Sequence, residues 1–175
     1  MRPDLASSPS ASRIELRFND GLATIEFELA QAKNSFRVQD VSRLAGLLDE
    51  AVSKGGRCIV LQGGAGVFSA GWDVGSISPG ADNPVAMIEE VVAPFLIKLR
   101  SLPVPTVSAV EGVALGFGFG LALSCDICIA DEQARFGSPF RQIGMVPDSG
   151  THYFLRERAG HGIASGLIFT GGVVT

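Results

Sequence analysis

The sequence predicts an α/β domain, and three observations indicate this fold class. Residues 14–29 alternate apolar and polar side chains on either side of an Asp-Gly pair, as the two strands of a hairpin do. Residues 38–52 carry apolar side chains at three- and four-residue spacing, which is typical of an amphipathic helix. Beyond residue 57, short apolar segments alternate with glycine-rich loops and helical segments, so we expect a sheet covered by helices.

The N-terminal half is expected to contain a hairpin, a helix and a buried strand. The hairpin turns at Asp20-Gly21, because glycine reaches the positive φ that such a turn requires. The helix over 38–52 ends at Gly55-Gly56, which supplies a C-terminal glycine. Residues 58–62, CIVLQ, then form a short apolar strand that leads into the glycine-rich loop GGAGVFSAGWDV, residues 63–74.

The C-terminal half is expected to add two strands and three helices. These are a helix over 83–100, a strand over 105–112, a short helix with a glycine-rich entry over 115–125, a strand over 126–131 and a helix over 151–168. Asn83 caps the first of these helices and Pro84 occupies its first position. Pro94 is expected to kink it.

Composition and charge narrow the possible partners. The chain has 175 residues, enough for one domain with a sizeable core, and 46% of them are hydrophobic against 18% charged. This balance favours a homo-oligomer, because so much apolar surface needs cover. The net charge of −4 comes without any Lys/Arg run, so no nucleic-acid partner is expected. The longest apolar stretches, such as residues 91–97, fall short of the roughly 20 residues that span a bilayer, so no membrane segment is expected.

The first twelve residues and the three cysteines point to the cytoplasm. Residues 1–12 mix Ser, Pro and Ala without a continuous apolar core, so we expect a disordered tail rather than a secretory signal. Cys58, Cys125 and Cys128 are odd in number and lack a secretory context, which favours reduced, buried structural thiols. Cys125 and Cys128 form a C-x-x-C, but no second pair or His cluster completes a zinc site, so no metal is expected.

Two glycine-rich segments can present main-chain hydrogen-bond donors. They are SAGWD, residues 69–73, and LGFGFG, residues 115–120, whose glycines let another group approach the backbone closely. If the two loops converge, the amides of Trp72 and Phe117 share one oxygen atom of a ligand, with Phe117 at a helix N-terminus that favours negative charge. The alternative is that these glycines only permit tight turns and close helix–strand packing.

The order of the motifs resembles the enoyl-CoA hydratase/isomerase, or crotonase, superfamily. The resemblance rests on GAGVFSAGWDV (residues 64–74) and on the segment from VPTVSAVEG to GMVPDSGT (residues 104–151), and it runs from about Ile14 to the end of the chain. It implies a crotonase-like spiral of repeated ββα units over residues 13–175, without the family's C-terminal helical segment. It also implies an acyl-CoA thioester as substrate, neither metal nor redox cofactor, and a trimer or hexamer.

The resemblance also assigns binding roles. In that family, the residue after the Ala-Gly of the first loop and the middle residue of the G-x-G in the second donate to the thioester oxygen; here these are Trp72 and Phe117. The neighbouring loop residues expected to frame the coenzyme A thioester are Ala70, Gly71, Gly116 and Gly118. The adenine is expected near the AKNSF segment, which makes Lys33 a candidate phosphate contact.

Both positions that carry catalytic glutamates in hydratases of the family lack an acid here. They are Gly120, in the helix after the second glycine loop, and Phe140, directly after the FG-x-P motif. Addition of water needs one group to activate the water and another to protonate carbon, so two-glutamate hydration is disfavoured. Moving a double bond needs only one carboxylate, which removes a proton from one carbon and returns it to another.

Asp148 is the candidate acid/base for such an isomerisation. Isomerase branches of the family carry an aspartate in a PD-x-G motif, and Asp148 stands at that position. We expect an apolar pocket of Phe140, Met145 and Val146 to raise its pKa from the ordinary value of about 3.9. The alternative is that Asp148, which follows Pro147, only caps the next helix.

The other polar candidates are expected to be structural. Asp73 is expected to hold the first loop by accepting backbone hydrogen bonds, and His161 is expected to be structural. His152 is a weaker acid/base candidate, because it begins a helix and is expected to face solvent or pack against that helix. Ser149 and His152 invite a hydrolase interpretation, but no G-x-S-x-G frames a serine, so a catalytic triad is disfavoured.

Rival functions come from other classes of protein. GFGFG suggests a dinucleotide fingerprint, but Leu121 stands where the third glycine is required, so an NAD enzyme is disfavoured. A non-catalytic acyl-CoA-binding relative is a stronger rival, because both glutamates are missing and the bulky Trp72 and Phe117 flank the expected pocket. An enoyl-CoA isomerase is preferred over it and over a hydratase with other acid/base groups.

Overall fold

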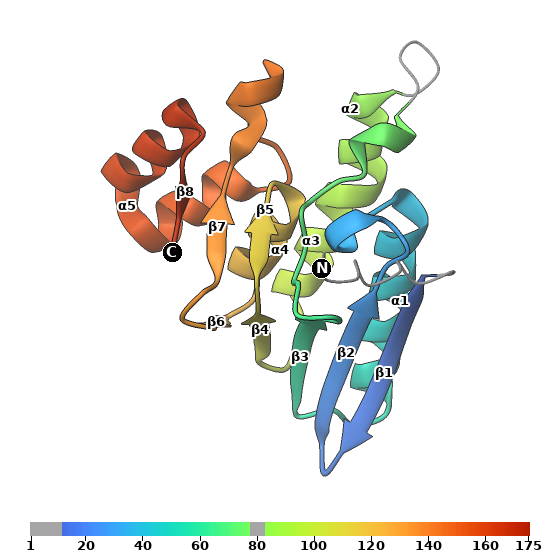
Figure 1. Cartoon of the computed structure of the whole chain (residues 1–175). Coiled ribbons are helices and arrows are strands. Elements are labelled where there is room, and N and C mark those ends of the chain that lie inside the picture. Colours follow the sequence, from blue (N-terminus) through green and yellow to red (C-terminus); the bar gives the residue numbers. More distant parts are fainter. Residues whose placement is uncertain (1–11, 78–82) are drawn as a thin grey trace, which may run out of the picture.

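The structure, a computed structural model, describes residues 12–77 and 83–175 and winds the chain into a spiral of strands and helices (Figure 1). Residues 1–11, nearly all of the tail expected over 1–12, lie outside the described residues. The predicted α/β class is confirmed.

The first layer is a five-stranded sheet in the order β1-β2-β3-β4-β6. Its strands are β1 (Arg13–Asn19), β2 (Leu22–Glu28), β3 (Cys58–Gly63), β4 (Thr106–Val110) and β6 (Ile127–Ala130). β1 and β2 pair antiparallel as the expected hairpin, and Asp20 and Gly21 at its turn both have positive φ. The other neighbours are parallel, and each crossover between them contains a helix, as parallel strands require.

A second sheet carries the loops of interest. It contains β5 (Val113–Leu115), β7 (Arg135–Gly137) and β8 (Val173–Val174). Isolated bridges extend it towards the N-terminal half, because Ser69 pairs with Ala114 and Trp72 pairs with Phe36. Successive turns of the spiral therefore add one strand to the first sheet and one extended segment to the second before a helix follows.

Helices cover the sheets and close one apolar core. The longer ones are α1 (Val38–Ser53), α4 (Phe117–Ser124) and α5 (Thr151–Thr170), and short 3₁₀ turns are η1 (Ala32–Asn34), η2 (Val74–Ser76) and η4 (Pro139–Ile143). The core joins buried side chains of β2, β3 and α1 to those of α4 and the helix that precedes β4. No helix within 12–77 and 83–175 combines the length and apolar character needed to cross a membrane.

The helix expected over 83–100 is present and contains a π-helical turn just before Pro94. It comprises α2 (Pro84–Met87), the π-helical turn η3 (Ile88–Val92) and α3 (Ala93–Arg100). Asn83 caps it through its side chain, as expected. Pro94 has no amide hydrogen for the carbonyl four residues earlier, and just before it the Ala93 amide donates to the Ile88 carbonyl, five residues back.

Other departures from the predicted elements occur where segments are short. β5, β7 and β8 span three residues or fewer, too few to show an alternating pattern. The strand expected over 105–112 ends early because the chain turns at Gly112, where an added Cβ would lie 2.5 Å from the Gly66 carbonyl oxygen. α5 is interrupted at Gly160, whose φ of 79° and ψ of 166° are not helical.

Gly46 offers a test of the helix assignment. It lies exposed in the middle of α1, and no heavy atom lies within 4 Å of the position that a Cβ would take. Gly46→Ala is expected to raise the free energy of unfolding by about 0.5–1 kcal/mol, because alanine loses less backbone entropy in a helix. Urea denaturation measures this change, and a lower midpoint for the variant would contradict the assignment.

Candidate functional site

The two glycine-rich loops lie side by side. The Ser69 amide donates to the Val113 carbonyl at 2.8 Å, and the Leu115 amide donates to the Ser69 carbonyl at 2.9 Å. These bonds align the first loop with β5, which leads directly into the second loop. The rings of Trp72 and Phe117 meet edge to face, with centroids 5.7 Å apart. The convergence expected of the loops is therefore present.

Only glycine fits where the loops touch. A Cβ on Gly71 would lie 2.7 Å from the Leu115 carbonyl oxygen and 3.3 Å from the Phe117 amide nitrogen. A Cβ on Gly118 would lie 2.6 Å from the Ser69 carbonyl oxygen. Gly71 also has a φ of 103°, in the region that side-chain-bearing residues rarely adopt. The glycines of these loops therefore permit both a tight turn and the close approach of the two backbones.

The amides of Trp72 and Phe117 are available to a ligand. The Phe36 amide donates to the Gly71 carbonyl at 2.8 Å, and the Phe36 carbonyl accepts from the Asp73 amide at 2.9 Å. A parallel bridge of this kind turns the Trp72 N–H away from Phe36. Phe117 is the first residue of α4, where amides have no helical acceptor. Within the described residues, neither amide donates a hydrogen bond.

The side chain of Phe117 belongs to the core rather than to the site. It is 1% exposed, and its ring centroid lies 5.2 Å from that of Phe36 and 6.4 Å from that of Phe95. The residue therefore presents only its main chain to a ligand. This removes one reason for the non-catalytic interpretation, in which a bulky Phe117 obstructs the pocket.

Asp148 lies partly buried in the turn before α5. Burial raises the pKa of its carboxyl above the ordinary value, while a hydrogen bond from the Ser149 hydroxyl to Oδ1 at 2.6 Å and the nearby His152 act in the opposite direction. No side chain caps α5, whose N-cap is Gly150; the Asp148 main-chain carbonyl accepts from the Thr151 amide at 3.0 Å. The capping alternative for this carboxylate is therefore wrong.

The apolar pocket expected around Asp148 is not built from the residues proposed for it. Val146 is 83% exposed and Met145 is 46% exposed, because both lie on the surface segment between η4 and α5. Phe140 is partly buried, and a Cβ on Gly116 would lie 3.7 Å from its ring. The turn that holds Asp148 packs instead against α4, where a Cβ on Gly120 would collide with the Ser149 carbonyl oxygen.

This packing leaves no room for an acidic side chain at position 120. Any side chain at Gly120 would also meet the Thr151 hydroxyl oxygen, 3.0 Å from the added Cβ. A glutamate there requires the Asp148 turn to move. Phe140 stands at the second glutamate position that the resemblance implies, and it cannot transfer a proton. Asp148 is therefore the remaining candidate acid/base at this turn.

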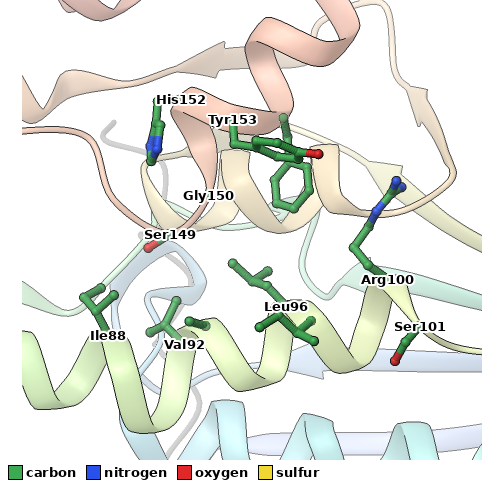
Figure 2. A pocket seen from close by; sticks show the side chains of 12 residues that line it. Ile88, Val92, Leu96, Arg100, Ser101, Ser149, Gly150, His152 and Tyr153 are labelled. Atoms are coloured by element: carbon green, nitrogen blue, oxygen red, sulfur yellow. The ribbon is translucent and has the colours of Figure 1, made fainter.

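A groove between α3 and α5 runs from this turn (Figure 2). The groove has a volume of about 590 Å³. Ile88, Val92 and Leu96 line one wall, and Ser149, Gly150, His152 and Tyr153 line the other, with Arg100 and Ser101 at one end. The sequence did not reveal this groove, because Ile88 and Val92 have the spacing of ordinary core residues. The structural sign of it is the π-helical turn that begins at Ile88, whose side chain is partly exposed.

Lys33 and Ala70 are joined through their main chains. The Ala70 amide donates to the Lys33 carbonyl at 2.9 Å, so the AKNSF segment lies against the first glycine loop. Lys33 is exposed and has a positive φ of 56°. The Lys33 main chain therefore contacts the loop, while the residue itself is open to solvent.

The remaining candidates do not form a second site. Asp73 accepts from Arg37 Nε at 2.8 Å rather than from the backbone, so its expected role is corrected to an ion pair between loop and helix. His152 and His161 are exposed. The Ser149 hydroxyl donates to Asp148, and no hydrogen bond joins it to His152 in the described chain, which leaves the triad without support.

The three cysteines differ in their exposure. All three thiols are free, but only Cys125 is buried; Cys58 and Cys128 are partly exposed, contrary to expectation. Burial raises the pKa of the Cys125 thiol to about 12, which keeps it protonated at neutral pH. In residues 12–77 and 83–175, no group of three or more His, Cys, Asp or Glu side chains is placed to hold a metal ion.

Ser149→Ala is expected to move the pH dependence of any reaction in which Asp148 acts as a base. The hydroxyl hydrogen bond stabilises the charged carboxylate, so its loss raises the pKa of Asp148 further. The acid limb of the kcat/KM profile should therefore shift to higher pH. An unchanged limb, measured with a variant of equal stability, would show that this hydrogen bond does not tune the reacting group.

Comparison with known proteins identifies the family. A model of the family described as Enoyl-CoA hydratase/isomerase matches residues 17–175. The class that the fold and the paired loops define is thus the crotonase superfamily, and the chain belongs to the enoyl-CoA hydratase/isomerase family.

Individual relatives include proteins named as isomerases and proteins named as hydratases. The chain is similar to the 1,2-epoxyphenylacetyl-CoA isomerase of Escherichia coli K12, with 33% identity over 160 residues, 86% of this chain and 60% of that protein. It is also similar to the human mitochondrial methylglutaconyl-CoA hydratase, with 32% identity over 165 residues, 89% of this chain and 47% of that protein.

Solved structures of the family share the fold. An enoyl-CoA hydratase from Polaromonas sp. JS666 has a TM-score of 0.85 at 25% identity, covering 93% of this chain and 65% of that one. One from Thermoplasma volcanium has a TM-score of 0.83 at 25% identity, covering 92% of this chain and 65% of that one. The chain spans less than two thirds of the length of these relatives.

Proposed function

We propose that this chain binds an acyl-CoA thioester and moves the double bond of an enoyl-CoA. The observation that carries the proposal is the pair of unbonded amides, Trp72 and Phe117, on touching loops. Two donors aimed at one thioester oxygen stabilise the negative charge that gathers there when an adjacent proton is removed. The N-terminus of α4 adds a favourable dipole at the same point.

Asp148 supplies the proton transfer in this proposal. Its carboxylate removes a proton from one carbon of the 3-enoyl group, and the electron pair moves towards the thioester oxygen to give an enolate. The carboxylic acid then returns the proton to the other end of the delocalised system. The double bond changes position, no atom is gained or lost, and no electron acceptor is required. The raised pKa of Asp148 favours the first half of this exchange, because it makes the carboxylate a stronger base.

The coenzyme A portion is proposed to lie along the first loop. Ala70, Gly71, Gly116 and Gly118 frame the thioester through their main chains, and Lys33 offers its ammonium group to a phosphate. The hydrogen bond between Ala70 and Lys33 supports this placement, because it holds the Lys33 main chain beside the loop. The apolar wall of the groove between α3 and α5 then faces the acyl group.

Hydration of the double bond is the second candidate, favoured by the hydratase names of several relatives. Its two acid/base groups would have to replace the missing glutamates. The steric exclusion of a side chain at Gly120 argues against the usual pair. We therefore place isomerisation first.

The test follows the absorbance of the conjugated 2-enoyl thioester. With a 3-enoyl-CoA as substrate, isomerisation raises this absorbance; with a 2-enoyl-CoA in water, hydration lowers it. Equilibrium binding of a saturated acyl-CoA and of free coenzyme A completes the experiment, and the thioester should bind more tightly because only it offers the carbonyl oxygen. A fall in absorbance with the 2-enoyl-CoA, without a rise from the 3-enoyl-CoA, would favour a hydratase. Equal affinities for the acyl-CoA and free coenzyme A, without turnover of either substrate, would favour a non-catalytic relative.

Assembly into a trimer or hexamer stays a prediction. Several apolar side chains are exposed on the edge strand β6 and the second half of α5, namely Ile127, Ile129, Ile163 and Phe169. These surfaces support self-association, because a monomer gains nothing from exposing them together.

A further inference from the structure

We propose that Thr151 is a positioning residue that holds the Asp148 turn and the Phe117 amide in one fixed arrangement. The inference rests on the proposed function, in which these two groups act on the same substrate. Thr151 is the first residue of α5 and is 0% exposed. Its hydroxyl donates to the Gly116 carbonyl at 3.2 Å, and its amide donates to the Asp148 carbonyl at 3.0 Å. One residue therefore contacts both halves of the site.

The hydroxyl acts on Phe117 through the peptide plane. The Gly116 carbonyl and the Phe117 amide belong to one planar unit, and in a trans peptide the C=O and N–H bonds point in opposite directions. A donor that anchors the oxygen therefore fixes the direction of the N–H. Gly116 has a φ of 52° and no side chain to hold it, so this peptide depends on external contacts for its orientation. The only other donor to its oxygen in the described residues is the Gly120 amide, at 3.0 Å.

Packing at Gly120 fixes the start of α5 against α4. A Cβ at this position would collide with the Ser149 carbonyl oxygen and lie 3.0 Å from the Thr151 hydroxyl oxygen, so the entry of α5 sits directly on α4. Ser149 has a φ of 54°, a conformation that non-glycine residues hold only when surrounding contacts impose it. The two hydrogen bonds of Thr151 are such contacts, and they follow Ser149 by two residues.

Fixed geometry matters because a proton transfer and charge stabilisation must occur together. A misplacement of about 1 Å between a reacting group and its substrate can lower the rate about 100-fold. Thr151→Val keeps the branched shape and removes the hydroxyl, whereas Thr151→Ser keeps the hydroxyl. For the valine variant we expect kcat for double-bond migration to fall by about 10- to 100-fold with a much smaller change in KM. The serine variant should recover most of kcat.

A second measurement does not depend on the reaction. In ligand-free protein labelled with [¹⁵N]phenylalanine, the Phe117 amide resonance should move in Thr151→Val and return in Thr151→Ser, while that of Phe68 stays in place. Thr106→Val is the matched control: Thr106 is 1% exposed, and its hydroxyl donates to Asp126 at 2.8 Å, outside the site. It should lower thermal stability and leave the Phe117 resonance and kcat per folded molecule unchanged.

The outcomes separate this inference from the proposed function. An unmoved Phe117 resonance in Thr151→Val, or a serine variant as impaired as the valine variant, overturns the positioning role. A different outcome is that the wild-type chain fails to isomerise every 3-enoyl-CoA tested, while the Phe117 resonance still moves in Thr151→Val and returns in Thr151→Ser. That result contradicts the proposed function and supports the control of the Phe117 amide by Thr151.

Discussion

Asp148→Asn is expected to reduce double-bond migration in a 3-enoyl-CoA by about 100- to 10,000-fold, the usual contribution of a positioned acid/base group. Asparagine keeps the shape of the side chain and can still accept from the Ser149 hydroxyl, but it cannot take up a proton from carbon. Binding of a saturated acyl-CoA should change little, because the amides of Trp72 and Phe117 are untouched. The rate of appearance of the conjugated thioester measures the effect.

Stability provides the internal control for this variant. The folded-state pKa of Asp148 is raised, so its contribution to stability is complete below the unfolded pKa of about 3.9 and is lost as the pH rises through the folded value. At neutral pH the buried charge therefore costs stability, and the uncharged asparagine is expected to unfold at the same or a higher denaturant concentration. Asp131→Asn, an exposed carboxylate beyond β6, should leave the rate unchanged. An active Asp148→Asn enzyme would show that another group moves the proton.

Gly71→Ala is expected to abolish the preference for thioesters over free coenzyme A and to lower turnover by at least about 100-fold. The added methyl group would lie 2.7 Å from the Leu115 carbonyl oxygen and 3.3 Å from the Phe117 nitrogen, and both are main-chain atoms that cannot swing aside. The two loops must therefore separate, which moves the Trp72 and Phe117 amides apart. Titration with acyl-CoA and with coenzyme A measures the preference.

Gly55→Ala separates backbone strain from loop separation. Gly55 has a φ of 79°, but no heavy atom lies within 4 Å of an added Cβ, and it follows α1 far from the site in sequence. It should cost about 1–2 kcal/mol of stability through strain alone and leave the thioester preference intact. If Gly71→Ala kept that preference as well, the contact between the loops would be irrelevant to binding.

Local patterns predicted much of this architecture. The hairpin, α1 and the helix cap at Asn83 follow from alternation, helical spacing and capping chemistry, which act within a few residues. The strands β5, β7 and β8 escape such patterns because they are short, and they exist through pairing with segments distant in sequence. The π-helical turn before Pro94 likewise depends on how the helix accommodates the missing amide hydrogen, which the sequence pattern does not specify.

Some parts of the candidate site could likewise be predicted from the sequence, and others could not. The glycines identified the paired loops, and the resemblance singled out Asp148, because those signals lie in the residues themselves. The apolar character of Met145 and Val146 suggested a pocket, but whether a residue is buried depends on what packs over it. The Arg37–Asp73 ion pair and the contact of Thr151 with Gly116 join segments more than thirty residues apart, so no local pattern could reveal them.

A crystal structure with an unreactive saturated acyl-CoA tests the central claim most directly. The account predicts that the thioester oxygen lies about 3 Å from the main-chain nitrogens of both Trp72 and Phe117. An oxygen that contacts solvent or a side chain, with either nitrogen beyond hydrogen-bonding distance, would contradict it.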